Sequence, residues 1–260
     1  MKRRRLDPQT LIRGSSADQA VSRNAAAGDA GPVPEGPIVP SMNTPHRSRR
    51  SVWLLILILV FLILNPLLEK DQMGEAVLLF SMYATLISAT RALSERTRVR
   101  WPATLLATTS MLAMAIAHFF PSRPLWIVNW AILAAFFGFI SVGFFAYLGR
   151  PGAVTDDRIF VSVSLYLLLG MLWFSLYNLL EAVHPGSFAL QSAPLSSLPR
   201  GTLIYLSLAT LTTLGYGDIV PVTPIARMVA ALEAVAGVLY IAITVARLVS
   251  GYRGGKQETV

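Results

Sequence analysis

The dominant feature of this sequence is a series of long apolar runs that contain almost no charged residues. Hydrophobic residues make up 54% of the 260 positions, and charged residues make up only 14%. A helix needs about 20 mostly apolar residues to cross the hydrocarbon core of a membrane. The sequence therefore predicts an all-α integral membrane protein with six transmembrane helices. These are residues 52–68, 76–89 (extended through Arg91 and Leu93), 101–120, 125–148, 159–180 and 225–248.

The distribution of basic residues predicts how the spans are oriented. If the amino terminus lies in the cytoplasm, 18 of the 22 Lys and Arg residues fall in cytoplasmic segments. Cytoplasmic loops carry an excess of Lys and Arg, so this orientation is favoured. Both termini are then cytoplasmic, and the loop between the fifth and sixth spans faces outward. We expect the protein in the cell membrane, meaning the plasma or inner membrane.

Composition excludes or disfavours several classes of function. The chain has no Cys, which rules out disulfides and Cys-based zinc sites. Its three histidines are scattered, and no acid pair or nucleophile dyad has a spacing suited to catalysis. We therefore expect neither enzymatic activity nor a resident cofactor. The basic tail, residues 1–50, is predicted to be disordered and to act as a topology signal that also touches anionic lipid, rather than to bind nucleic acid.

Between the last two spans lies an apolar run that is too short to cross the membrane. The run TLIYLSLATLTT, residues 202–213, rises only about 1.5 Å per residue as a helix, against about 30 Å of hydrocarbon. The next span must also start from the same outer side. We therefore predict a re-entrant pore helix between the fifth and sixth spans. Irregular backbone at that depth is tolerated only where it is buried in protein or lines a watery cavity.

The sequence LGYGD, which follows this short helix, has the chemistry of a cation site. Gly215 and Gly217 lie two positions apart, and glycine adopts positive φ freely. Alternation between ordinary and positive φ would point successive carbonyls along one axis. Stacked by symmetry from several chains, such oxygens replace the hydration shell of a cation. The predicted filter is Thr213, Leu214, Gly215, Tyr216 and Gly217, with cation ligands from Thr213, Leu214, Gly215 and Tyr216.

The stretch TLTTLGYGD, residues 210–218, resembles the signature of potassium channels, which reads Thr, two residues, Thr, one residue, Gly-Tyr-Gly-Asp. The next stretch, residues 219–248, resembles the inner helix of small bacterial potassium channels, with Gly237 where that family has its hinge. The resemblance covers residues 159–252 and does not extend to the first four spans. It implies passive, K⁺-selective conduction, with K⁺ as the ion held by the predicted ligands. Because the chain has a single filter sequence, the resemblance also implies a homotetramer.

Residues around the filter are expected to support it. The short helix would aim its carboxyl end at the membrane centre, where the helix dipole favours a dehydrating cation. The Tyr216 ring would brace the filter near Tyr205, and Asp218 would add a ring of carboxylates outside it. The predicted support residues are Thr210, Thr212, Asp218 and Tyr205.

The last span contains two residues that invite a gating or tuning role. An intramembrane carboxylate such as Glu233 is by default a functional hypothesis, as a charged ring or a proton sensor. The alternative is a carboxyl group hydrogen-bonded behind the filter to a hydroxyl such as that of Ser207 or Thr210. Gly237 is interpreted either as a hinge or as a close-packing position between helices. The Thr-Pro pair at residues 223–224 predicts an N-cap for this helix.

These features divide the chain into four parts. Residues 1–50 form the tail, residues 51–150 a four-helix transmembrane region, residues 151–252 the pore domain, and residues 253–260 a short cytoplasmic tail. The pore domain comprises an outer helix, the pore helix, the filter and the inner helix. The fourth span contains no Lys or Arg, so we predict that the channel is not voltage-gated.

Two alternatives to a selective channel follow from the same sequence. One is a cation channel of weak selectivity, and the other is a non-conducting or regulatory membrane subunit with a vestigial pore. Both would be favoured by a degenerate filter. Tyr216 and Gly217 are intact here, which argues against either alternative.

Overall fold

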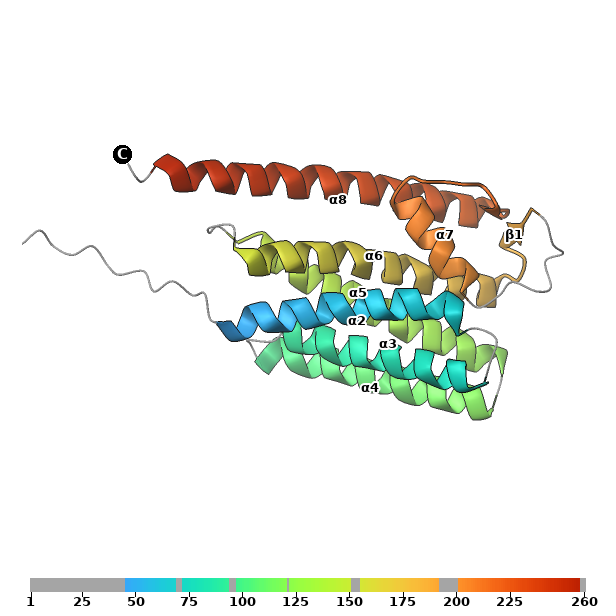
Figure 1. Ribbon diagram of the computed structural model, residues 1–260. Coiled ribbons are helices and arrows are strands. Elements are labelled where there is room, and N and C mark those ends of the chain that lie inside the picture. Colours follow the sequence, from blue (N-terminus) through green and yellow to red (C-terminus); the bar gives the residue numbers. More distant parts are fainter. Residues whose placement is uncertain are drawn as a thin grey trace, which may run out of the picture. The chain divides into compact units, whose positions relative to one another are not determined.

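In the computed structural model the described residues, 45–68, 72–93, 97–120, 122–150, 155–191 and 201–257, are mostly helical (Figure 1). All of them lie in one unit, Asn43–Val260. Figure 1 shows the long helices running in roughly a common direction, with one short helix, α7, inclined to them. The elements are α2 (Pro45–Leu67), α3 (Gln72–Leu93), α4 (Thr97–Phe119), α5 (Arg123–Leu148), α6 (Asp156–Val183), β1 (Phe188–Leu190), α7 (Thr202–Leu211), β2 (Ile219–Pro221) and α8 (Pro224–Gln257).

Four helices in the described part of the chain are long and apolar enough to cross a membrane. They are Arg50–Leu67, Arg123–Leu148, Asp156–Val183 and Pro224–Arg247. The second and third predicted spans lie in α3 and α4, whose apolar stretches are shorter, at Val77–Ala92 and Trp101–Ala117. Both helices have polar or charged residues at their ends, which shortens the uncharged part of each. The prediction of a mostly helical membrane protein is therefore confirmed, with four rather than six clear candidate spans.

Helix α6 is the element around which the others are arranged. It packs against α2 and α5, which come before it, and against α7 and α8, which follow it. Among the side chains buried in α5 and α6 are Phe136, Phe137, Leu165 and Leu168, all fully excluded from solvent. Between helices in a membrane such side chains stabilise the fold by van der Waals packing rather than by removal from water. Helix α6 thus links the helices before it to α7 and α8.

Two helices extend into the segments that were predicted to be terminal tails. Helix α2 begins at Pro45, inside the segment expected to be disordered, because proline is tolerated in the first turn of a helix. Helix α8 continues to Gln257, into the expected carboxyl-terminal tail. The predicted N-cap of α8 is confirmed, since the Ala226 N–H donates to Thr223 Oγ1 at 3.3 Å. Most of the predicted tail, residues 1–44, and residues 258–260 lie outside the described part of the chain.

A buried carboxyl group joins three helices at the start of α6. Asp157 is only 5% exposed. Its Oδ1 accepts a hydrogen bond from Ser51 Oγ of α2 at 2.6 Å, and its Oδ2 accepts one from the Tyr147 hydroxyl of α5 at 2.7 Å. The neighbouring Asp156 lies in the same first turn but is exposed. Both aspartates interact favourably with the helix dipole. Asp157 in addition holds α2 and α5 through its contacts to Ser51 and Tyr147.

We expect Asp157→Asn to lower the free energy of unfolding by about 1–3 kcal/mol, because the amide cannot accept both hydrogen bonds equally and leaves a buried donor mismatched. Thermal unfolding of the purified chain in detergent measures this change. Asp156→Asn is the matched control, since it removes the same charge from the same helix turn. Equal destabilisation by the two variants would show that the contacts to Ser51 and Tyr147 do not matter.

Candidate functional site: the segment after α7

The short helix α7 lies between α6 and α8 and packs against both. Its ten residues, Thr202–Leu211, extend over about 15 Å, half of the hydrocarbon thickness. The helix ends at Thr212, whose N–H donates to the Leu208 carbonyl at 3.0 Å and whose Oγ1 donates to the same carbonyl at 2.7 Å. The expected short helix is therefore present, two residues shorter than the apolar run that predicted it.

The backbone after α7 alternates between positive and ordinary φ. The φ angles are 58° at Thr213, 54° at Gly215 and 78° at Gly217, and no other described residue of this segment has positive φ. The N–H groups of Leu214 and Gly215 both point at the Ala209 carbonyl, at 2.8 and 3.2 Å. The end of α7 therefore supplies the acceptor for the amides of this segment. This is the alternation that the two glycines led us to expect.

The carbonyl oxygens of the same segment have no recorded partner. Across the described part of the chain, none of the backbone hydrogen bonds ends on a carbonyl of Thr213, Leu214, Gly215 or Tyr216. A backbone carbonyl that is removed from water needs a partner. These four oxygens are thus free to bind water or a cation.

The positive φ of Thr213, a residue of the predicted filter, was not expected from the sequence. A β-branched residue rarely adopts positive φ, and the conformation costs of order 1–3 kcal/mol. Strain of this kind is usually retained at functional sites. The only signal in the sequence is its place, two residues before Gly215 in the same alternation. Thr213 thus has the positive φ that we expected only at the two glycines.

A two-stranded ladder fixes the outer end of the segment. Strand β1 pairs antiparallel with β2, so that Ala189 lies opposite Val220. The ladder is extended at one end by the Gln191 N–H, which donates to the Asp218 carbonyl at 2.9 Å. These strands were not predicted from the sequence, because strands of three residues have no detectable periodicity.

Glu181, at the end of α6, holds this ladder in turn. Its carboxylate accepts hydrogen bonds from the backbone N–H groups of Gly186 at 2.7 Å, Ser187 at 3.0 Å and Phe188 at 3.3 Å. A carboxylate with several N–H donors makes charge-assisted bonds that are stronger than neutral ones. Glu181 is a residue that the sequence analysis missed, since its role depends on a turn that comes five residues later.

The expected support residues lie near the segment, with different contacts. The Tyr205 hydroxyl donates to Asp218 Oδ1 at 3.3 Å, which connects α7 to the residue after Gly217. The Tyr216 ring is 69% exposed in the single chain, and Thr210 lies beside Tyr177 of α6. Tyr205 and Asp218 are thus brought together, whereas the surface of Tyr216 is left open.

Glu233 is fully buried where α6, α7 and α8 meet. Its Oε1 lies 2.6 Å from Ser207 Oγ, and its Oε2 accepts a hydrogen bond from the Tyr177 hydroxyl. Of the two hydroxyls considered from sequence, Ser207 is the partner. This geometry favours the hydrogen-bonded alternative over a carboxylate ring that faces an open pore.

Gly237 lies directly against the end of α7. A Cβ atom at this position would overlap the carbonyl oxygen of Leu211. The same carbonyl accepts a hydrogen bond from the Tyr166 hydroxyl of α6 at 3.1 Å. This contact favours the close-packing interpretation of Gly237, because only a glycine lets α8 approach the Leu211 carbonyl so closely.

Residues 161–252 match the family described as "Ion channel". Potassium voltage-gated channel subfamily A member 10 of Mus musculus and of Homo sapiens is 37% identical to this chain over 87 residues. Subfamily A member 5 of Mustela putorius furo is also 37% identical over 87 residues. No solved structure matches the chain significantly.

The matches confirm the resemblance to potassium channels over the pore region. They cover 34% of this chain, but only 16% of the member 10 channels and 13% of the member 5 channel. The matched family and relatives are ion channels and not enzymes. The helices before residue 161 lie outside the family match.

We expect Gly237→Ala to lower the free energy of unfolding by about 1–3 kcal/mol, because the new methyl group must displace the end of α7. Gly138→Ala in α5 is the control, since a Cβ there would lie 3.9 Å from Leu172 Cδ1, an ordinary contact. Thermal unfolding in detergent compares the two. If Gly237→Ala is as stable as Gly138→Ala, then close packing does not explain this glycine.

Proposed function

We propose that this chain is a subunit of a potassium-selective channel whose filter is the backbone of residues 213–217. The observation that carries the proposal is the alternation of positive φ at Thr213, Gly215 and Gly217. It occurs in a segment whose carbonyls have no recorded partner in the described part of the chain. Carbonyl oxygens aligned in this way substitute for the hydration shell of K⁺. The match of the surrounding residues to ion channels supports the same conclusion.

The functional unit in this proposal is a homotetramer. One chain offers a single filter segment, and it leaves Leu214 54% exposed and Tyr216 69% exposed. Helix α8 also carries an extensive exposed apolar surface, which neighbouring subunits and lipid would cover. Its members include Ile225, Met228, Leu232, Val235, Val238 and Leu239.

In the assembled channel α7 would enter the membrane from the outer side and return through residues 212–221. Helices α3 and α4 would complete a set of six transmembrane helices, with both termini in the cytoplasm of a cell membrane. The basic tail would contact anionic lipid. These parts of the proposal rest on the hydropathy and the distribution of Lys and Arg.

We further propose that the channel is not gated by voltage. Voltage sensing needs several charges that move through the field, each worth about 2.3 kcal/mol per 100 mV. Helix α5 has one basic residue, Arg123, at its first position. Its guanidinium donates to the carbonyls of Ala182 and Val183 at 2.8 and 2.6 Å, which ties it to the end of α6. The matched relatives are named as voltage-gated, but the match is confined to about a third of this chain.

Reconstitution of the purified chain in liposomes with a K⁺ gradient tests the function. We expect K⁺ and Rb⁺ to pass, Na⁺ to pass hardly at all, and Ba²⁺ to block. The flux should change only in proportion to the driving force when the membrane potential is varied. Equal flux of Na⁺ and K⁺ would contradict a selective filter, and the absence of any cation flux would contradict the proposed function.

Gly215→Ala tests the filter assignment, because an alanine at a φ of 54° is strained although there is space for its side chain. We expect folding and membrane insertion to be retained while K⁺ flux is lost. Gly138→Ala should conduct normally. Selective flux that is unchanged in Gly215→Ala would show that the filter lies elsewhere.

Mixing this variant with the unsubstituted chain tests the number of subunits. If one altered filter segment disables a tetramer, flux should fall as the fourth power of the unsubstituted fraction. A linear decrease would indicate that each chain conducts independently.

A further inference from the structure

The Glu233 side chain is the meeting point of three helices. It is 0% exposed on α8, and its two oxygens contact Tyr177 of α6 and Ser207 of α7. The Tyr166 hydroxyl of α6 also interacts electrostatically with the Glu233 carboxyl. Each of these neighbours is an uncharged hydroxyl group. No cation from the described residues is among the groups found to interact with this carboxyl.

The hydrogen bonds around Ser207 require one more hydrogen than the hydroxyls can supply. Ser207 Oγ lies 2.6 Å from Glu233 Oε1 and 2.8 Å from the Gly170 carbonyl oxygen. A serine hydroxyl has one hydrogen, whereas a carbonyl and a carboxylate can only accept. If Glu233 were ionised, one of the two short contacts would place two acceptors together. A protonated Glu233 completes the set, because it donates to Ser207 while Ser207 donates to Gly170 and Tyr177 donates to Glu233.

We propose that Glu233 is held as a neutral carboxylic acid and acts as a positioning residue for the filter. An unpaired buried carboxylate is costly to desolvate, and a neutral acid with every hydrogen bond made is not. Ser207 lies two residues before Ala209, whose carbonyl accepts from Leu214 and Gly215. The acid therefore fixes the part of α7 that orients the filter amides. The positioning role rests on the proposed function, whereas the protonation state does not.

Infrared spectroscopy of the full chain in liposomes tests the protonation state without any flux measurement. At neutral pH we expect a C=O stretching band of a buried protonated acid that disappears in Glu233→Gln. Glu181→Gln is the control and should leave this band in place. Ser207→Ala should shift the band, because the acid loses its acceptor. If the spectra of the unsubstituted chain and Glu233→Gln do not differ in this band, the neutral acid is refuted.

Flux measurements test the positioning role. Glutamine can donate to Ser207 and accept from Tyr177. Glu233→Gln should therefore conduct with unchanged selectivity. Ser207→Ala and Tyr177→Phe should each lower K⁺ flux or the K⁺ to Na⁺ ratio by about 2- to 10-fold, the factor that corresponds to one lost hydrogen bond. Loss of flux in Glu233→Gln, or normal conduction in both hydroxyl variants, would overturn the positioning role. A chain without flux in any form would instead contradict the proposed function.

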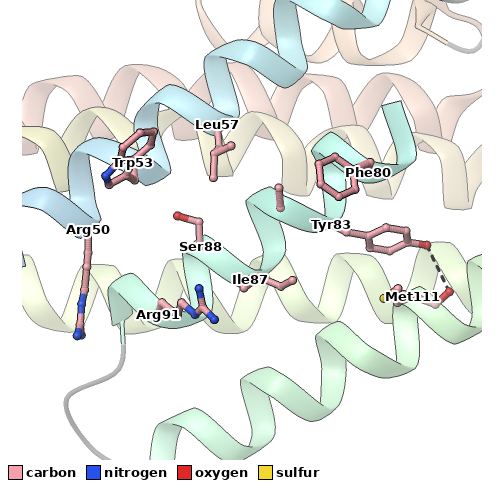
Figure 2. A pocket seen from close by; sticks show the side chains of 10 residues that line it. Arg50, Trp53, Leu57, Phe80, Tyr83, Ile87, Ser88, Arg91 and Met111 are labelled. Atoms are coloured by element: carbon pink, nitrogen blue, oxygen red, sulfur yellow. Dashed lines mark hydrogen bonds between the residues drawn. The ribbon is translucent and has the colours of Figure 1, made fainter. Parts of the chain in front are cut away.

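A second inference concerns a groove far along the chain from the filter. A cavity of about 780 Å³ lies between α2, α3 and α4 (Figure 2). Figure 2 shows Arg50, near the start of α2, and Arg91, near the end of α3, at the same end of this groove. Trp53 and Phe80 lie along its apolar part and are 61% and 75% exposed. Ser88 adds a hydroxyl near Arg91.

The chemistry of the groove matches an anionic phospholipid. Two guanidinium groups lie at one end, and no acidic side chain is among the described residues that line it. Arginine binds phosphate oxygens well, and the apolar floor suits an acyl chain. The positive-inside distribution puts this end at the cytoplasmic leaflet, where anionic lipids attract basic residues by about 1 kcal/mol each. We infer that an anionic phospholipid of that leaflet occupies the groove.

Native mass spectrometry of the full chain with phosphatidylglycerol and phosphatidylcholine tests this second inference. We expect preferential retention of phosphatidylglycerol that falls about 5- to 10-fold in Arg50→Gln or Arg91→Gln, since each removes about 1 kcal/mol of attraction. Arg247→Gln, outside the groove, should retain the preference. An excess of inorganic phosphate should not displace the lipid, because the acyl chain anchors it. Equal retention of the two lipids, an equal effect of Arg247→Gln, or displacement by phosphate would each refute the lipid site.

Discussion

The contact of α7 with its two neighbouring helices is the constraint on which the segment after α7 depends. A ten-residue helix is too short to cross a membrane, so its length does not fix its depth there. Contacts to the helices on both sides hold α7 in place instead. Ser207 reaches Glu233 of α8 and Gly170 of α6, and Leu211 is held by the Tyr166 hydroxyl and the close approach of Gly237.

The segment after α7 is held from both ends, and its middle is left free. At the inner end the Ala209 carbonyl receives two amides of the segment, and at the outer end the Asp218 carbonyl is bonded to Gln191. Within residues 213–216, the hydrogen bonds at the inner end involve the N–H groups of Leu214 and Gly215. No backbone hydrogen bond among the described residues involves a carbonyl of residues 213–216. This division leaves the oxygens of the segment available, and it explains why a strained φ at Thr213 can be maintained.

Helix α6 connects two parts of the chain that differ in their relation to known proteins. The family match begins at residue 161, inside this helix, and excludes the helices before it. The same helix also buries Asp157 against Ser51 and Tyr147. The first helices therefore connect to α7 and α8 mainly through α6, with an additional ring contact between Phe145 of α5 and Tyr240 of α8.

The sequence by itself determined the membrane class, the short helix and the positive φ of Gly215 and Gly217, because hydropathy, length and glycine chemistry act locally. It also determined the N-cap at Thr223. It could not determine the positive φ of Thr213, the ladder of β1 with β2, the amides bound by Glu181, or which hydroxyls meet Glu233. Those depend on contacts between residues far apart in the chain, such as Tyr177 and Glu233. The tertiary structure also favours packing over a hinge at Gly237, because its close neighbour Leu211 belongs to another helix.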